Sequence, residues 1–347
     1  MATQLILLFL HLSLLLPISA ITTPYLSPST FHPNHHQMLQ TLQIYAYNPP
    51  QNPNFSTSAA AAAFHAALIR SPFITADPNL AHLFYLPLPP SPSTRSVSRH
   101  IRTVRSDLPF WNRTLGADHF ILTCDGLDFE SDRNLVELKK NSVHVTCSSP
   151  LPVDGRFVPH KDLALPAFAS PNLPLLNRTV ERFLAYHGYG GFNDPQILTV
   201  LNKLRRDADF LIESEPSHPG DRARRMSESR FCLFFYGAGR DLMVGDALRF
   251  GCVPVLISSR PIIDLPFYDV IRWSEIAVFV RLGEDVKRAI EETCVGAGHL
   301  RMREAGVAAS VHFRWNEPPE HFDAFNMVMY QLWLRRHTIR YARRNSN

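Results

Sequence analysis

The stretch from residue 229 to 257 constrains the fold of this chain more than any other. It holds two apolar runs, 231–235 and 253–257, separated by a turn that contains Gly237 and Gly239 and by a short segment with helical character. A strand, a glycine turn, a helix and a second strand form a βαβ-like unit. The turn of such a unit can direct backbone N–H groups and a helix start at a phosphate. The pattern therefore predicts a parallel sheet that handles a nucleotide.

The length of 347 residues favours two domains over one core, and a hydrophobic fraction of 45% is enough for both to bury a core. Strand-like runs alternate with helix-like stretches on both sides of a Pro- and Asn-rich boundary at 163–178. The runs are 42–47, 82–86, 120–123, 143–146, 183–186, 210–213, 231–235, 253–257 and 276–280. Such alternation is typical of parallel sheets covered by helices.

We therefore expect an α/β fold of two Rossmann-like domains, at 41–165 and 181–318, joined by a linker at 166–180. The last segment, 319–347, has apolar residues at a helical period followed by a basic tail. We expect it to form a C-terminal helix that packs back on the N-terminal half.

The first twenty residues carry an apolar core that is followed by small residues ending at Ala20, which is typical of a secretory signal peptide. A retained signal anchor stays open as the alternative. Residues 21–40 are rich in Pro, Ser, Thr and His, and they suggest a stem or linker. Three glycosylation sequons, at Asn54, Asn112 and Asn177, are consistent with the secretory pathway.

The net charge of +4 gives no strong case for a nucleic-acid partner. The five cysteines show neither CxxC nor His/Cys ligand spacing, which argues against a zinc site. In an oxidising compartment they form one or two disulfides and leave at least one thiol unpaired. Cys124 with Cys147 is the first pairing to expect, because both residues lie near the ends of neighbouring strand-like runs.

Two motifs in the βαβ-like unit carry a family resemblance. They are Ser229-Arg230-Phe231-Cys232-Leu233 and Gly251-Cys252-Val253-Pro254-Val255. With Asp246-Ala247-Leu248 between them, they resemble the central motif of the exostosin-like glycosyltransferases, a large family in plants. Further matching stretches are 44–47, 75–78, 109–113, 116–120, 155–157, 264–267, 270–273, 312–315 and 323–325. The resemblance covers roughly residues 42 to 342.

The resemblance implies a GT-B fold and inverting transfer of a sugar from a UDP-sugar to a cell-wall polysaccharide or a glycoprotein glycan. It implies that the C-terminal half binds the donor and the N-terminal half the acceptor. It also implies a lumenal Golgi location, as a type II membrane protein or as a cleaved soluble form, and catalysis without a bound metal. Homo- or hetero-oligomers with other transferases are a further expectation.

Donor binding needs a partner for the ribose and groups that stabilise the diphosphate. Asp246 matches the acidic position of the family motif, where a carboxylate can accept hydrogen bonds from ribose hydroxyls. Gly237 and Gly239 form the turn. The cations expected at the diphosphate are, in decreasing order of expectation, Arg240 and then Arg249 and Arg230. The general base expected for the acceptor hydroxyl is Asp125, at the end of a strand in the N-terminal half.

The chain departs from the family pattern at two positions where relatives carry an Arg. They are occupied here by Met243 and Asp194. Both departures remove a cation, and they favour a second hypothesis. On that hypothesis the chain is a catalytically weakened homologue that binds glycans or supports an active partner in a complex.

Overall fold

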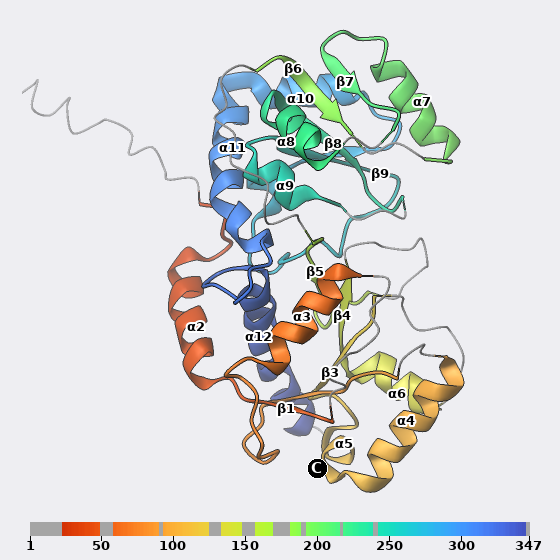
Figure 1. Cartoon of the computed structure of the whole chain (residues 1–347), viewed down its shortest axis with the longest axis vertical. Coiled ribbons are helices and arrows are strands. Elements are labelled where there is room, and N and C mark those ends of the chain that lie inside the picture. The colour runs from red at the N-terminus through yellow and green to blue at the C-terminus, as the bar shows by residue number, and fades with distance from the viewer. Residues whose placement is uncertain are drawn as a thin grey trace, which may run out of the picture.

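The structure is a computed structural model of the chain. It describes residues 23–48, 58–89, 93–124, 133–147, 157–168, 181–188, 192–215, 218–238 and 242–344. Two five-stranded parallel sheets lie one above the other along the long axis of the molecule (Figure 1). Helices cover both faces of each sheet. The expected α/β fold with two Rossmann-like halves is confirmed.

The N-terminal sheet has the order β1-β2-β3-β4-β5, with every neighbouring pair parallel. Its strands are β1 (Ile44–Ala46), β2 (Leu83–Tyr85), β3 (His119–Leu122), β4 (Val143–Cys147) and β5 (Leu163–Leu165). A parallel bridge joins Ile44 to Ile74 on the free side of β1. The chain thus leaves β1, returns briefly beside it, and then crosses to β2. This path is a reduced form of the 2-1-3-4-5 order of doubly wound folds.

The helices of this half cover opposite faces of the sheet. They are α3 (Ala59–Ile69), α4 (Thr94–Asp107), α5 (Pro109–Thr114) and α6 (Arg133–Asn141). The helix α3 packs Phe64 and Leu68 into one core, whereas α4 packs Val97 and Ile101 into another. A run of five alanines favours helix in α3, and the Ser58 hydroxyl caps it by accepting from the Ala61 N–H at 3.2 Å.

The C-terminal sheet has the order β10-β9-β8-β6-β7, again all parallel. Its strands are β6 (Phe183–His187), β7 (Phe210–Ile212), β8 (Ser229–Phe235), β9 (Val253–Ser258) and β10 (Val278–Arg281). Its helices are α7 (Pro195–Leu204), α8 (Pro219–Ser227), α9 (Val244–Arg249), α10 (Val286–Cys294) and α11 (Gly298–Ala309), with short 3-10 turns at η2 (Trp273–Glu275), η3 (Val295–Ala297) and η4 (Ser310–Phe313). Counted from β6, this order is a complete 2-1-3-4-5 arrangement.

The side chains of β8 alternate between two cores, as a strand buried on both faces requires. Phe231 and Leu233 belong to the core under α7 and α10, and Cys232 and Phe234 to the core under α8, α9 and α11. The C-terminal sheet is therefore doubly wound, with helices on both faces.

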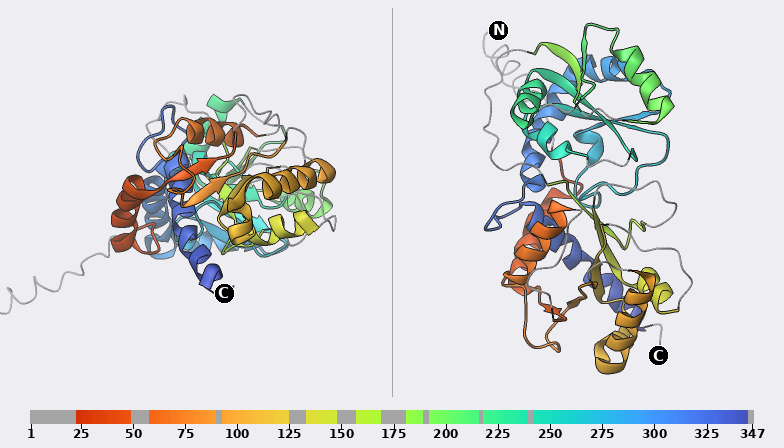
Figure 2. Two further views of the ribbon diagram at one scale, coloured as in Figure 1. Left: turned by 90° about the horizontal axis from the view of Figure 1, so that it is seen from below. Right: turned by 45° about the vertical axis from the view of Figure 1, so that its right-hand side comes forward.

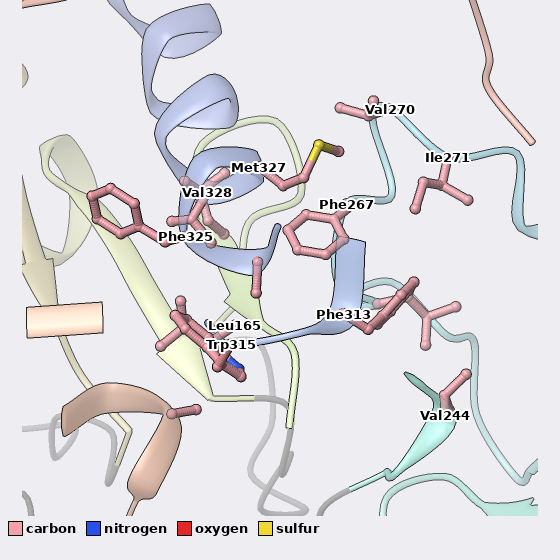
Figure 3. Packing of buried hydrophobic residues seen from close by; sticks show 14 of the residues in the cluster. Leu165, Val244, Phe267, Val270, Ile271, Phe313, Trp315, Phe325, Met327 and Val328 are labelled. Atoms are coloured by element: carbon pink, nitrogen blue, oxygen red, sulfur yellow. The ribbon is translucent and has the colours of Figure 1, made fainter. Parts of the chain in front are cut away.

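The last helix, α12 (Ala324–Arg344), crosses back and packs against the N-terminal half, where it contacts α2, α3 and β5. Figures 1 and 2 show it running down through that half. Phe325 and Val328 of α12 gather with Phe267 and Phe313 of the C-terminal half in one buried cluster at the junction, which also includes Trp315 (Figure 3). The expected return of the C-terminal helix is confirmed, and it joins the two halves into one core.

One expectation needs correction. Residues 21–40 are not simply a stem, because Pro28–Thr41 form helix α2, which packs against α12. Phe31, His35 and Met38 are buried at a spacing of four and three residues, which is the period of a helix face. The surrounding Pro, His and Gln residues lower the mean hydropathy and conceal that face in the sequence.

The structure contains two disulfides, Cys124–Cys147 and Cys232–Cys252. The first links the end of β3 to the end of β4, and the second links β8 to the residue before β9. The second pairing was not predicted. The sequence shows the βαβ-like unit but not the register of its strands, and the register brings these two cysteines together. Cys294 is the free thiol among the described cysteines.

Candidate donor-binding site

Ligands of doubly wound sheets bind at the carboxyl edge, where neighbouring strands lead to helices on opposite faces. In the C-terminal half this point lies between β6 and β8, since α7 follows β6 on one face and α9 follows β8 on the other. His187 ends β6 here and Gly188 follows it, and Tyr236 and Gly237 follow β8. We call these four residues, with the first turn of α9, the switch-point crevice.

Gly237 has a φ of +80°, a left-handed conformation that glycine adopts without steric cost. The backbone before it is fixed, because the Tyr236 N–H donates to the Ile257 carbonyl at 2.8 Å. The Tyr236 hydroxyl donates to the carboxylate of Asp264, and burial raises the pKa of Asp264 to about 6. The turn is thus held from both sides. Gly239 and Arg240, the next predicted members, lie outside the described residues.

Asp246 lies on the first turn of α9, and only 3% of it is exposed. Its Oδ1 atom has no hydrogen-bond partner among the described residues. Burial raises the pKa of Asp246 to about 6, against the opposing charges of Arg222 and Arg249. Buried polar atoms are nearly always paired in folded proteins, so an unpaired carboxylate oxygen requires an explanation. An oxygen acceptor at this place is suited to a hydroxyl donor from a ligand.

The position of α9 depends on a close contact with η4. A Cβ added to Gly245 would lie 2.5 Å from the Cβ of Phe313, so glycine is needed for this approach. Phe313 belongs to the motif 312–315, and its neighbour His312 holds the chain by a 2.7 Å contact with the Phe322 carbonyl. This motif therefore supports the helix that carries Asp246.

The other two predicted cations lie at different distances from the crevice. Arg230 is the second residue of β8, at the amino end, about 17 Å from the carboxyl end at 3.3 Å per residue. Its Nε atom donates to Glu181 at 2.6 Å. Arg249 ends α9 and lies half-buried near Asp246 and Arg314, where burial and Arg314 lower its pKa. The expectation that Arg230 binds the donor is corrected by its place at the opposite edge of the sheet.

The two departures from the family pattern have local structural roles. Asp194 caps α7, because its Oδ1 accepts from the Gln196 N–H at 2.7 Å and from the Ile197 N–H at 3.3 Å. Met243 precedes α9 and packs against the hydrophobic core. Asp194 thus stabilises a helix start, which accounts for a carboxylate at that position.

Sequence reasoning missed Arg260, Tyr236 and Asp264. All three follow β8 or β9 at the carboxyl edge, and the guanidinium of Arg260 lies 5.2 Å from the centre of the Tyr236 ring. The sequence did offer one signal for these residues, because all three follow strands that the sequence predicts.

In the N-terminal half, Asp125 lies outside the described residues. Its neighbour Cys124 is fixed by the first disulfide. His119 is buried and packs edge-on against Trp111 with ring centroids 4.8 Å apart. The Nδ1 atom of His119 contacts Asp118 at 2.8 Å, and Nε2 contacts the Tyr47 hydroxyl at 2.9 Å. Burial alone would raise the pKa of Asp118, but the hydrogen bonds it accepts outweigh burial and hold its pKa below the ordinary value.

Of the three sequons, Asn112 lies on α5 and is exposed, and its Nδ2 donates to the Arg105 carbonyl at 3.0 Å. Asn54 and Asn177 lie outside the described residues. Within the described residues, no three His, Cys, Asp or Glu side chains gather as a metal site. In that same part of the chain, no helix is long and apolar enough to span a membrane.

The family model described as the exostosin GT47 domain matches residues 38–291. A probable glycosyltransferase of Arabidopsis thaliana is 27% identical over 91% of this chain and 66% of its own length. The probable beta-1,4-xylosyltransferase IRX10 of Arabidopsis thaliana is 28% identical over 79% of this chain and 77% of its own length. A probable glucuronosyltransferase of Oryza sativa subsp. japonica is 29% identical over 83% of this chain and 79% of its own length.

This chain spans slightly less than two thirds of the length of the first of these relatives. The family model covers both halves of the molecule, including all of β8, α9 and β9. The chain therefore belongs to the exostosin GT47 family of glycosyltransferases.

Proposed function

We propose that the protein transfers a sugar from a UDP-sugar to a hydroxyl of a cell-wall polysaccharide or a glycoprotein glycan, with inversion at the anomeric carbon. The observation that carries the proposal is Asp246, a buried carboxylate with an oxygen that no described residue pairs, on the first turn of the helix at the switch-point crevice. The names of the xylosyl- and glucuronosyltransferase relatives support a UDP-pentose or a UDP-uronic acid as donor.

In this proposal, Asp246 accepts hydrogen bonds from the ribose hydroxyls, and the turn at Gly237 brings backbone N–H groups to the diphosphate. The acceptor lies in the N-terminal half, where Asp125 takes the proton of the attacking hydroxyl. Inversion follows when that oxygen attacks the anomeric carbon from the face opposite to UDP. Side-chain cations and N–H groups stabilise the leaving diphosphate without a metal ion.

The proposed compartment is the Golgi lumen, reached through the apolar segment at residues 1–20 as a signal peptide or anchor. The two disulfides support an oxidising compartment, since such bonds are rare in proteins that stay in the cytosol.

Calorimetric titration with UDP, UDP-xylose and UDP-glucuronic acid tests the proposal. We expect the wild type to bind UDP in the presence of EDTA, and Asp246→Asn to bind it about 10- to 100-fold more weakly, as the loss of a charge-assisted hydrogen bond predicts. Glu304→Gln is the matched control, because Glu304 is an exposed carboxylate on α11.

Failure of the folded wild type to bind any of these ligands, with or without manganese, contradicts the proposal. Equal binding by Asp246→Asn and the wild type contradicts the role given to Asp246.

A further inference from the structure

Arg260 is a cation held at the same edge of the sheet as the switch-point crevice. It follows β9 by two residues, and Ser258 fixes its backbone on both sides. The Ser258 hydroxyl donates to the Arg260 carbonyl at 2.8 Å and accepts from the Arg260 N–H at 3.2 Å. The backbone is thereby anchored to the end of a buried strand, while the side chain stays exposed.

The side chain of Arg260 reaches back from β9 to the turn after β8. A Cβ added to Gly237 would lie 3.3 Å from the Nε atom of Arg260, which means that the guanidinium group itself lies directly beside the glycine. The guanidinium also lies over the Tyr236 ring, 5.2 Å from its centre. Stacking on an aromatic ring orients a guanidinium and leaves its N–H groups available to other acceptors.

No carboxylate among the described residues lies within ion-pair distance of Arg260. Other arginines of the C-terminal half do have such partners, as Arg230 has Glu181 and Arg225 has Glu213. The nearby carboxylate of Asp264 is occupied by the Tyr236 hydroxyl. Arg260 thus presents a positive charge that no described carboxylate pairs with, beside a glycine turn at the edge where this type of sheet binds its ligands.

We propose that Arg260 binds the diphosphate of the nucleotide-sugar donor and stabilises the negative charge on UDP as it leaves. This inference rests on the proposed function. In the transfer step the bond between the anomeric carbon and the β-phosphate oxygen breaks, and its electron pair stays on UDP. The acceptor oxygen forms the new bond, its proton passes to a base, and Arg260 remains protonated throughout. A planar guanidinium suits this role, because it donates two parallel N–H groups to phosphate oxygens.

The proposal also assigns a cation to a site where Met243 supplies none. Met243 immediately precedes α9 and packs against the core, whereas Arg260 approaches Gly237 from the end of β9. The positive charge at the diphosphate would therefore come from the loop after β9 and not from the start of α9.

The test compares Arg260→Ala, Arg260→Lys and the wild type in UDP binding by calorimetry and in uridine binding by ligand-observed NMR. We expect Arg260→Ala to bind UDP about 10- to 100-fold more weakly and uridine unchanged, because only UDP carries the diphosphate. Arg260→Lys should recover part of the UDP affinity. Arg272→Ala, an exposed arginine of the same half, is the control and should bind UDP like the wild type.

Thermal unfolding checks that the variants fold, and an exposed side chain such as Arg260 should change the midpoint little. If the wild type binds UDP and Arg260→Ala binds it equally well, the role of Arg260 is wrong and the proposed function stands. An equal loss of UDP and uridine binding would also overturn the role, since it would indicate a disturbed turn. If the folded wild type binds neither UDP nor a UDP-sugar, both proposals fail.

Discussion

Arg335 of α12 and Asp269 of the C-terminal half form an ion pair of 2.6 Å across the junction between the two halves. The side chain of Arg335 is only 9% exposed, and its Nε atom also donates to the Lys161 carbonyl of the N-terminal half at 3.2 Å. One guanidinium thus binds groups from both halves.

Arg335→Ala should lower the free energy of unfolding by about 2 to 4 kcal/mol, since it removes the cation from the partly buried Asp269 carboxylate and leaves only the Gln331 amide bonded to it among the described residues. Chemical denaturation measures the change. Arg272→Ala is the control: the Arg272–Glu275 pair is 4.0 Å long and exposed, so its loss should change stability by less than about 0.5 kcal/mol. Similar losses in both variants would show that Arg335 adds nothing beyond a surface pair.

Asp246→Asn should stabilise the protein at pH 7 by about 1 to 3 kcal/mol while it weakens donor binding. Burial raises the pKa of Asp246 from 3.8 to about 6, so the folded state binds this proton more tightly than the unfolded state does. The Asp246 contribution to stability therefore falls as pH rises from about 4 to 6. Asparagine stays neutral over this pH range, so the variant does not undergo this loss of stability.

Denaturation of the wild type and Asp246→Asn at pH 4.5 and pH 7 measures the effect. The difference in unfolding free energy between the two proteins should be clearly larger at pH 7 than at pH 4.5. Comparing the two proteins cancels the opposite effect of His35, His144 and His312, whose buried rings have pKa values lowered to about 4. A difference that does not change with pH would contradict the assignment to Asp246.

Gly245→Ala should destabilise the protein by about 1 to 3 kcal/mol, because the new methyl group would meet the Cβ of Phe313 at 2.5 Å. Gly220→Ala is the matched control. Gly220 also lies in a helix, but a Cβ there meets nothing within 4 Å, so alanine should stabilise by about 0.5 to 1 kcal/mol. Thermal unfolding of both variants shows whether the signs are opposite, and a loss of equal size at both positions would exclude the contact as the cause.

Replacing both Cys232 and Cys252 by alanine should lower stability by about 3 kcal/mol, as expected for a closed loop of this length. Cys294→Ala should change little, because Cys294 has no disulfide partner. Mass spectrometry of non-reduced peptides locates the bond, and denaturation of the variants measures its contribution. A peptide that links Cys294 to Cys232 or Cys252 would contradict this pairing.

The alternation of strands and helices could be predicted well from the sequence, and the expected strand run at 253–257 lies within β9. Buried parallel strands are continuous apolar runs, which are easy to recognise. The helix α2 could not be recognised in this way, because its buried face includes His35 and its mean hydropathy is low. The three-residue strand β5 lies inside the segment 163–178 that was expected to be the boundary, and its pairing with β4 identifies it as a strand.

The candidate site was predictable in part. Gly237 and Asp246 follow β8 in the chain, so the sequence alone predicts that both lie at the carboxyl edge of the sheet. Arg230 is the second residue of the same strand, and strand direction alone places it at the other edge. Arg260 was missed because its contact with Gly237 depends on the register between β8 and β9, and the register is a property of the folded sheet.

The packing of α2 and α12 against one another has a consequence for synthesis on the ribosome. The N-terminal half is translated first, but part of its core is covered by α12, which is translated only after the C-terminal half. Vectorial folding therefore cannot complete this half early, because Phe64 and Phe73 lack their contact with Phe325 until α12 has been synthesised. The C-terminal half acts as an insertion between two pieces of one folding unit, and a nascent chain stalled before residue 324 should remain bound to chaperones.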